Sequence, residues 1–202
     1  MKLKKITISL TVGLILSVFW TLASFASSVE EIEDNVLRLH IIANSDSKVD
    51  QALKIKVRDA VLDAGFADFE QSQNLDEAIA KATELLPVFN EAAKKVISKE
   101  GFNYDVKVTI EDSYFNTRVY DDFSLPAGTY KALKIVIGEG KGKNWWCVMF
   151  PSVCISSCKD HDISDAVGDK STKICKNSDE YEIRFKIFDW YESIKNKIFN
   201  NL

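Results

Sequence analysis

His40 is one of only two histidines in the chain, and it lies close in sequence to hydroxyl and carboxyl side chains. Ser45, Asp46 and Ser47 follow it, so a nucleophile, a base and a carboxylate are nominally present. The chain lacks Gly-x-Ser-x-Gly, His-Glu-x-x-His and Asp-Thr/Ser-Gly, which are signatures of common hydrolase classes. The residues around His40 still allow one enzymatic function, an exported hydrolase that acts on cell-wall material through His40, and we keep it as the alternative to the function reached below. A partly buried strand histidine is the simpler interpretation.

Oxygen-bearing side chains near His40 could also bind a cation. Asn44, Asp46 and Asp50 are close together in the sequence, but they lack the Asp-x-Asp-x-Asn-Gly run and the distal Glu of an EF-hand loop. Asp46 and Asp50 stand at the start of a predicted helix, where the helix dipole favours negative charge. The pattern therefore indicates a helix start, and we expect neither a metal nor another cofactor.

The stretch GEGKGKNWWCVMFPSVC, from Gly138 to Cys154, has glycines and lysines like those of a phosphate-binding loop. A Walker loop has the form Gly-x-x-x-x-Gly-Lys-Ser/Thr and opens a helix. Here Asn144 replaces the hydroxyl residue, and strand-like residues follow the glycines. The pattern predicts instead a β-hairpin between strands at 131–137 and 145–150, with the lysines in solvent.

Trp145 and Trp146 are adjacent in the second of these strands, so their side chains point to opposite faces. Both faces of the strand are apolar, which favours core packing of both tryptophans. An exposed tryptophan would instead be a candidate contact with a partner protein.

The first residues of the chain decide its compartment. Three lysines precede an uncharged apolar run from Ile6 to Phe25, and small residues follow. This is the layout of a secretory signal peptide with cleavage after Ala26. An uncleaved anchor is the alternative, because about 20 apolar residues can span a bilayer, and the N-terminus would then contact the membrane. In both cases residues 27–202 are exported.

Removal of residues 1–26 changes the formal charge from −4 to −7, because that segment holds three lysines and no acidic residue. No basic surface remains that would neutralise phosphates, so we expect no nucleic-acid partner. The 176 residues that remain (202 minus 26) suit a single exported domain.

The four cysteines are Cys147, Cys154, Cys158 and Cys175, and no two of them form a Cys-x-x-Cys pair. His161 is the only imidazole near them, and export favours disulfides over a zinc site. Because Pro151-Ser152 can turn the chain, we expect Cys147 to pair with Cys154, which leaves Cys158 for Cys175. Buried free thiols are the alternative.

The spacing of apolar residues predicts the other elements. Two helices are expected: one at 48–63, which Ser47 and Asp50 begin and Gly65 ends, and one from Asn74 to Gly101, which Pro87 kinks or breaks. Strands are expected at 36–43 (half-buried), 104–111, 114–120, 131–137, 145–150 and 181–186, with a turn at 125–128, a polar excursion at 155–180 and a final helix at 187–199. This order predicts an α+β domain with a mainly antiparallel sheet packed with helices.

Three stretches carry a resemblance: LRLHIIANSDSKVDQALKIKVRDAV (Leu37–Val61), LPAGTYKALKIVIGEGKGKNWWCVMFP (Leu125–Pro151) and RFKIFDWYESIK from Arg184. Together they resemble the stage II sporulation protein R family of endospore-forming bacteria. The resemblance implies a signal that is made in the forespore and exported into the space between the two sporulation membranes. There it would activate a membrane-embedded aspartic protease of the mother cell, which processes the sigma-E precursor.

On this resemblance the chain is an activating ligand and not an enzyme, since the chemistry belongs to its partner. The residues that we expect to contact the partner are Arg38, Asn44, Asp46, Asp50, Arg58 and Asp59, together with Trp145 and Trp146. A solvated helix face is the alternative for Arg58 and Asp59.

The sequence departs from the usual family pattern at two places, Pro151-Ser152-Val153-Cys154 and Asn116-Thr117-Arg118. Cys158 and Cys175 have no assigned family counterpart. A second disulfide between them is therefore expected from the compartment alone.

Overall fold

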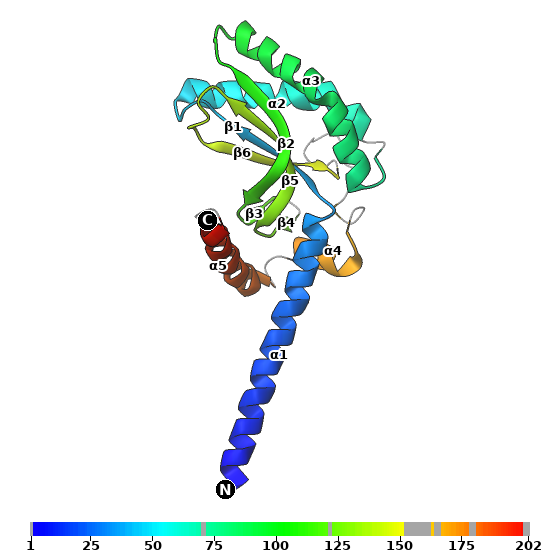
Figure 1. Ribbon diagram of the computed structural model, residues 1–202, viewed down its shortest axis with the longest axis vertical. Coiled ribbons are helices and arrows are strands. Elements are labelled where there is room, and N and C mark those ends of the chain that lie inside the picture. The colour runs from blue at the N-terminus through cyan, green and yellow to red at the C-terminus, as the bar shows by residue number, and fades with distance from the viewer. Residues whose placement is uncertain are drawn as a thin grey trace. The chain divides into compact units, whose positions relative to one another are not determined.

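The computed structural model describes residues 2–69, 72–120, 123–151, 163, 167–177 and 181–199, and only the backbone at 2–3, 66–69, 182–184 and 195–199. The chain divides into two compact units, which are drawn in Figure 1. Unit 1 consists of Met1–Ile32, Phe115–Gly128 and Gly168–Leu202, and unit 2 of Glu33–Tyr114 and Thr129–Val167.

A four-stranded sheet is the centre of unit 2. Its strands are β1 (Leu37–Ile42), β2 (Val106–Phe115), β5 (Gly128–Ile137) and β6 (Asn144–Phe150), in the order β2-β5-β1-β6. β1 pairs in parallel with β5, with Leu39 opposite Leu133, and antiparallel with β6, with Leu39 opposite Cys147. The predicted α+β class is confirmed, and the sheet is mixed.

The predicted hairpin between residues 131–137 and 145–150 is wrong, although both strands exist. β1 lies between β5 and β6, so residues 138–143 cross the end of β1 instead of forming a tight turn. β1 is also not half-buried, because Arg38 and His40 on its second face are buried with the rest of the strand. A strand that is covered on both faces and paired on both edges is a central strand.

The apolar face of the sheet forms the core of unit 2. Side chains of β1 and β5, such as Leu39, Ile41 and Ile135, pack there against helices α2 (Lys48–Phe69) and α3 (Leu75–Lys99). The two helices also pack against each other.

Helix α2 begins as predicted, because the Asp50 backbone N–H donates to Ser47 Oγ at 3.1 Å. It does not end at Gly65 but continues to Phe69. A Cβ at Gly65 would lie 2.4 Å from Cε1 of Phe89 on α3. Gly65 therefore lets α2 and α3 approach closely, and this packing offsets the poor helix propensity of glycine.

Helix α3 begins at the predicted cap, where the Glu77 backbone N–H donates to Asn74 Oδ1 at 3.0 Å. Pro87 lies inside this helix without breaking it, and Figure 1 shows α3 curved rather than interrupted. Gly101, with φ of +83°, ends the helix as predicted.

The predicted strand at 114–120 is wrong, because its two ends belong to different elements. β2 runs to Phe115, and β3 (Arg118–Val119) pairs antiparallel with β4 (Ser124–Leu125) in unit 1. The turn predicted at 125–128 is only the short link at Pro126-Ala127 between β4 and β5.

Unit 1 also contains α4 (Asp169–Lys176), which lies in the predicted polar excursion, and α5 (Glu182–Phe199). The predicted strand at 181–186 is wrong. Tyr181, Phe185 and Phe188 follow each other at four- and three-residue spacing, so they share one face of a helix and pack together.

Helix α1 (Lys2–Glu33) is one continuous helix, drawn in blue in Figure 1. Residues Lys4–Glu33 are long and apolar enough to cross a membrane, by length and composition. This helix fits the predicted signal sequence.

Candidate functional site

Two loops of unit 2 that are far apart in the sequence meet at the end of β1. We call them the loop cluster: residues 43–46 and 138–143, with Asp50, Lys54 and Tyr104. Backbone bonds join the loops directly, since Gly142 N–H donates to Ala43 O at 2.9 Å and Lys141 N–H to Asn44 O at 3.1 Å. The first loop contains Ala-Asn-Ser-Asp, from the stretch Leu37–Val61, and the second contains the glycines of the stretch that begins at Gly138.

Two side chains of the first loop hold the backbone of the second. Asn44 Oδ1 accepts a hydrogen bond from Glu139 N–H at 3.0 Å, and Asp46 Oδ1 accepts one from Lys143 N–H at 2.7 Å. Asn44 Nδ2 also donates to Asp50 Oδ2 at 3.0 Å. Asn44 and Asp46, both predicted site residues, therefore connect the two loops through hydrogen bonds.

The glycines of the second loop allow this close approach. Gly138 has φ of +57°, and a Cβ there would lie 2.3 Å from Asn44 Oδ1. A Cβ at Gly142 would lie 2.3 Å from the Ser45 carbonyl oxygen. These glycines thus serve contact between loops, and neither a hairpin turn nor a phosphate site explains them.

The Asp50 carboxylate is the buried centre of the loop cluster, with 4% of its surface exposed. It accepts hydrogen bonds from Ser45 Oγ, Asn44 Nδ2 and Tyr104 Oη, the last at 3.2 Å. The Ser45 bond and then the Asn44 and Tyr104 bonds lower the pKa of Asp50 against the opposing effect of burial. Asp50 is therefore a carboxylate that fixes the loops, and it is too buried to touch a partner directly.

Lys54 and Tyr104 complete the loop cluster and were not predicted. Lys54 Nζ donates to Lys143 O at 2.9 Å and to Gln51 Oε1 at 2.7 Å, and burial lowers its pKa. Lys54 could have been suspected, because it lies on the same helix face as the predicted Asp50. Nothing local in the sequence marks Tyr104, whose role depends on the folded position of β2.

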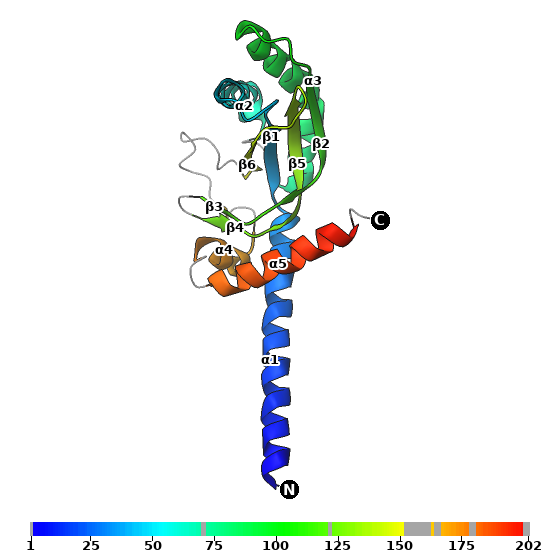
Figure 2. The same ribbon diagram turned by 90° about the vertical axis from the view of Figure 1, so that its left-hand side faces the viewer.

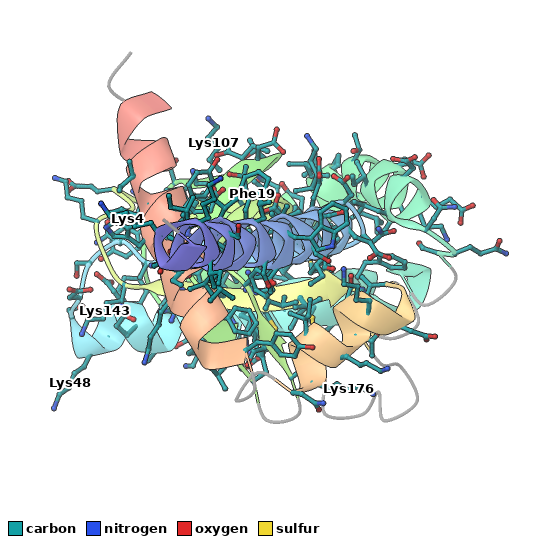
Figure 3. All side chains as sticks on the ribbon, turned by 90° about the horizontal axis from the view of Figure 1, so that it is seen from below. Lys4, Phe19, Lys48, Lys107, Lys143 and Lys176 are labelled. Atoms are coloured by element: carbon teal, nitrogen blue, oxygen red, sulfur yellow. The ribbon has the colours of Figure 1, made fainter. Side chains whose placement is uncertain are left out.

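The exposed surface of the loop cluster consists of charged side chains. Glu139, Lys141 and Lys143 are exposed, and their backbone N–H groups make the bonds described above. Lys141 Nζ lies 2.7 Å from Glu139 Oε2. Figure 3 places Lys143 and Lys48 at the same edge of unit 2, and Lys107 away from them. The loop backbone is thus fixed while its side chains can meet another molecule.

Arg58, Asp59 and Trp145 form a neighbouring patch. The Arg58 guanidinium carbon lies 4.4 Å from the centre of the Trp145 ring, and its Nη2 donates to Asp59 Oδ1 at 2.6 Å. The Asp59 side chain is 53% exposed. The structure therefore brings three predicted contact residues together on α2 and β6.

Arg38, His40 and Trp146 lie on the other face of the sheet. Arg38 is fully buried, with its guanidinium carbon 4.9 Å from the Tyr130 ring centre, so it cannot touch a partner directly. The His40 ring stacks on Trp146 at 4.2 Å. Burial lowers the pKa of His40 to about 4, although the side chain of Asn144 acts in the opposite direction. His40 is therefore a neutral, packed imidazole.

The structure tests part of the disulfide prediction, because it describes Cys147 and Cys175. Cys147 is disulfide-bonded, but Cys154 and Cys158 lie outside the described residues, so the pairing of Cys147 with Cys154 stays a prediction. Cys175 is a free, buried thiol, and burial raises its pKa to about 12. The predicted pairing of Cys158 with Cys175 is therefore wrong, because Cys175 packs inside unit 1.

Comparison with known proteins places this geometry in a family. The family model described as Stage II sporulation protein R (spore_II_R) matches residues 33–160, which include the whole loop cluster. Stage II sporulation protein R of Bacillus subtilis (strain 168) is 40% identical over 123 residues, or 61% of this chain and 55% of the relative. The chain thus spans about half the length of this curated relative. No solved structure matches this chain. The chain belongs to the stage II sporulation protein R family.

Proposed function

We propose that this chain is an exported sporulation signal, made in the forespore, that activates a membrane-embedded aspartic protease of the mother cell. The protease then processes the sigma-E precursor, and the chain itself makes or breaks no bond. The observation that carries this proposal is the loop cluster. Two of the sequence stretches that carry the resemblance to the family fold against each other and present a fixed, charged surface.

The arrangement of polar side chains favours a ligand over the alternative hydrolase. A hydrolase that used His40 would need a hydroxyl within reach of its imidazole. The Ser45 hydroxyl instead donates to Asp50, and His40 stacks on Trp146. Because both side chains are engaged in packing and structural hydrogen bonds, they support a scaffold for the loops.

The exposed side chains of the glycine loop support recognition of a partner through charge. Glu139, Lys141 and Lys143 are bonded to the first loop through their backbone N–H groups, so changes to these three exposed side chains leave the fold intact. A preformed loop loses little conformational entropy on binding. Lys141 and Lys143 are therefore suited to contact an acidic surface of the partner.

Reconstitution tests the proposal. The full chain is expressed in a non-sporulating host with the candidate membrane protease and the sigma-E precursor, and precursor cleavage is followed over time. We expect cleavage only when the chain is present and exported. Equal cleavage without the chain would overturn the activating role.

A charge-reversal variant tests the surface. Lys141→Glu combined with Lys143→Glu should slow precursor cleavage about tenfold or more, because contact charges steer and hold a partner. Lys107 is an exposed lysine on β2, and Lys107→Glu is the matched control. With this variant, the protease should cleave the precursor at the unmodified rate. If the double variant is folded and fully active, the loop cluster is not the contact surface. If instead folded His40→Ala alone abolishes function, the hydrolase replaces the ligand.

A further inference from the structure

Helix α1 has two parts with opposite surroundings. Its large apolar side chains between Ile6 and Trp20 are exposed, and Phe19, labelled in Figure 3, is 68% exposed. Phe25, Val29 and Ile32 in the same helix are 2% exposed or less. The change occurs between Trp20 and Phe25, just before the predicted cleavage site at Ala26, which itself lies within the helix.

The buried part of α1 belongs to the core of unit 1. We call this core the ring cluster: Phe25, Val29, Ile174, Tyr181, Phe185 and Phe188. The Phe25 ring centre lies 5.5 Å from that of Phe185, 5.8 Å from Phe188 and 6.3 Å from Tyr181. Phe25 is thus the residue that the three rings of the C-terminal segment share.

Polar bonds attach α1 to α4 on both sides of Ala26. Before it, Lys170 Nζ donates to the Ser24 carbonyl oxygen at 3.2 Å. After it, Gly168 N–H donates to Glu31 Oε1 at 2.9 Å, and Ser171 Oγ donates to Glu31 Oε2. The Glu31 carboxylate meets the N-terminus of α4, where the helix dipole favours an anion. Cleavage after Ala26 would remove Ser24 and Phe25 from this packed structure.

We infer that α1 is not removed but stays as a membrane anchor whose partner is the lipid bilayer. The exposed residues 6–20 form about 22 Å of helix, and residues 21–24 extend it to about 28 Å, close to the hydrocarbon thickness of a bilayer, before Phe25 enters the core of unit 1. The lysines before residue 6 stay on the cytoplasmic side. The exposed part of α1 is buried in lipid, and the buried part holds unit 1 at the membrane surface.

A second apolar surface in unit 1 fits this placement. Ile187, Trp190, Tyr191 and Ile194 of α5 are exposed and share one helix face, at whose edge the Tyr191 ring lies 6.0 Å from that of Phe188. Figure 2 shows α5 running across the direction of α1, to which the ring cluster attaches it. Tryptophan and tyrosine are favoured at the boundary between lipid and water.

Fractionation of the exported chain tests the inference independently of protease activation. The full chain is expressed in a bacterium with an active signal peptidase, membranes are washed with salt and alkaline carbonate, and the intact mass is measured. We expect the whole chain, residues 1–202, in the washed membranes. A soluble polypeptide that begins at Ser27 would overturn the inference, even if it activates the protease.

A matched pair of substitutions in α1 separates the roles of its two parts. Phe25→Ser should speed hydrogen exchange of the α4 and α5 amides about tenfold or more in detergent, because it removes the shared ring. Phe19→Ser removes the same side chain from the exposed part and should leave that exchange unchanged. Phe25→Leu, which keeps apolar volume, should fall between them and covers the case in which Phe25→Ser does not fold. Identical hydrogen exchange in the Phe25 variants and in Phe19→Ser would overturn the inference, since Phe25 would then not attach α1 to α4 and α5.

Discussion

The loop cluster of unit 2 and the ring cluster of unit 1 both join segments that are far apart in the sequence, but they do so by different interactions. In the loop cluster, Asn44 and Asp46 accept directional hydrogen bonds from backbone N–H groups, and Asp50 accepts them from side chains. In the ring cluster, Phe25 and its neighbours are held by apolar contact between rings. The first depends on the position of single atoms, and the second on filled volume.

This difference predicts which changes each region tolerates. A hydrogen bond between two loops weakens steeply when its acceptor moves out of the narrow range of favourable distances and angles. Exposed side chains can vary at positions where only the backbone makes the bond. An aromatic core accepts small rotations, but it loses stability in proportion to the volume that is removed. The loop cluster is therefore suited to present variable side chains, and the ring cluster to hold an anchor.

The largest effect is expected in the ring cluster. Phe185→Ala should lower the free energy of unfolding of unit 1 by about 3 to 5 kcal/mol, because it leaves a cavity beside Phe25. Trp190→Ala on the same helix is the control, since Trp190 is 69% exposed and should cost less than about 1 kcal/mol. Urea unfolding in detergent, followed by hydrogen exchange of α5 amides, measures both. Equal losses from the two variants would show that the rings do not form the core of unit 1.

A pH effect should follow in unit 2. The pKa of His40 is about 4 in the folded chain, against an ordinary value of 6.5, so the unfolded chain binds the proton more readily. The free energy of unfolding is therefore highest above pH 6.5 and falls as the pH drops to about 4, by about 3 kcal/mol in total.

Urea midpoints of unit 2 amides between pH 7.5 and 4 measure this effect. His40→Gln cannot take up the proton and should remove most of the pH dependence. A steep dependence that persists in His40→Gln would assign it to other groups. Below pH 4, protonation of Asp50 should loosen the loop cluster further, because its pKa is lowered in the folded chain and that stability is lost in acid.

The sequence predicted those parts of the fold that depend on local pattern. Ser47 and Asn74 begin their helices as predicted, and Gly101 ends α3, because caps are made by residues close in sequence. Gly65 misled the prediction because its neighbour, Phe89, comes from another helix. The alternation at Tyr181–Lys186 misled it as well, because the same residues also fit one helix face.

Sheet order and the site required information that is not local. The hairpin prediction placed β5 beside β6, whereas β1 lies between them with apolar side chains on one face and buried polar ones on the other. Asn44, Asp46 and Asp50 were selected as surface contacts, and the structure shows that they hold the glycine loop. Their residue types indicated a polar function, but only the fold shows which loop they bind.

The smallest effect tests the atomic fit of the loop cluster by comparing two glycines with positive φ. Gly138→Ala and Gly101→Ala share the strain of a left-handed backbone, but a Cβ meets Asn44 Oδ1 at 2.3 Å in the first and open space in the second. Gly138→Ala should therefore cost about 2 kcal/mol more than Gly101→Ala in urea unfolding. Asn44 cannot turn away freely, because its amide bonds both Glu139 N–H and Asp50. Combining Gly138→Ala with Asn44→Ala should recover part of the extra cost, since the overlapping atom is gone. If the two single glycine variants lose equal stability, the two loops do not approach each other as closely as their hydrogen bonds require. The charged surface of the loop cluster is then not held in one fixed geometry.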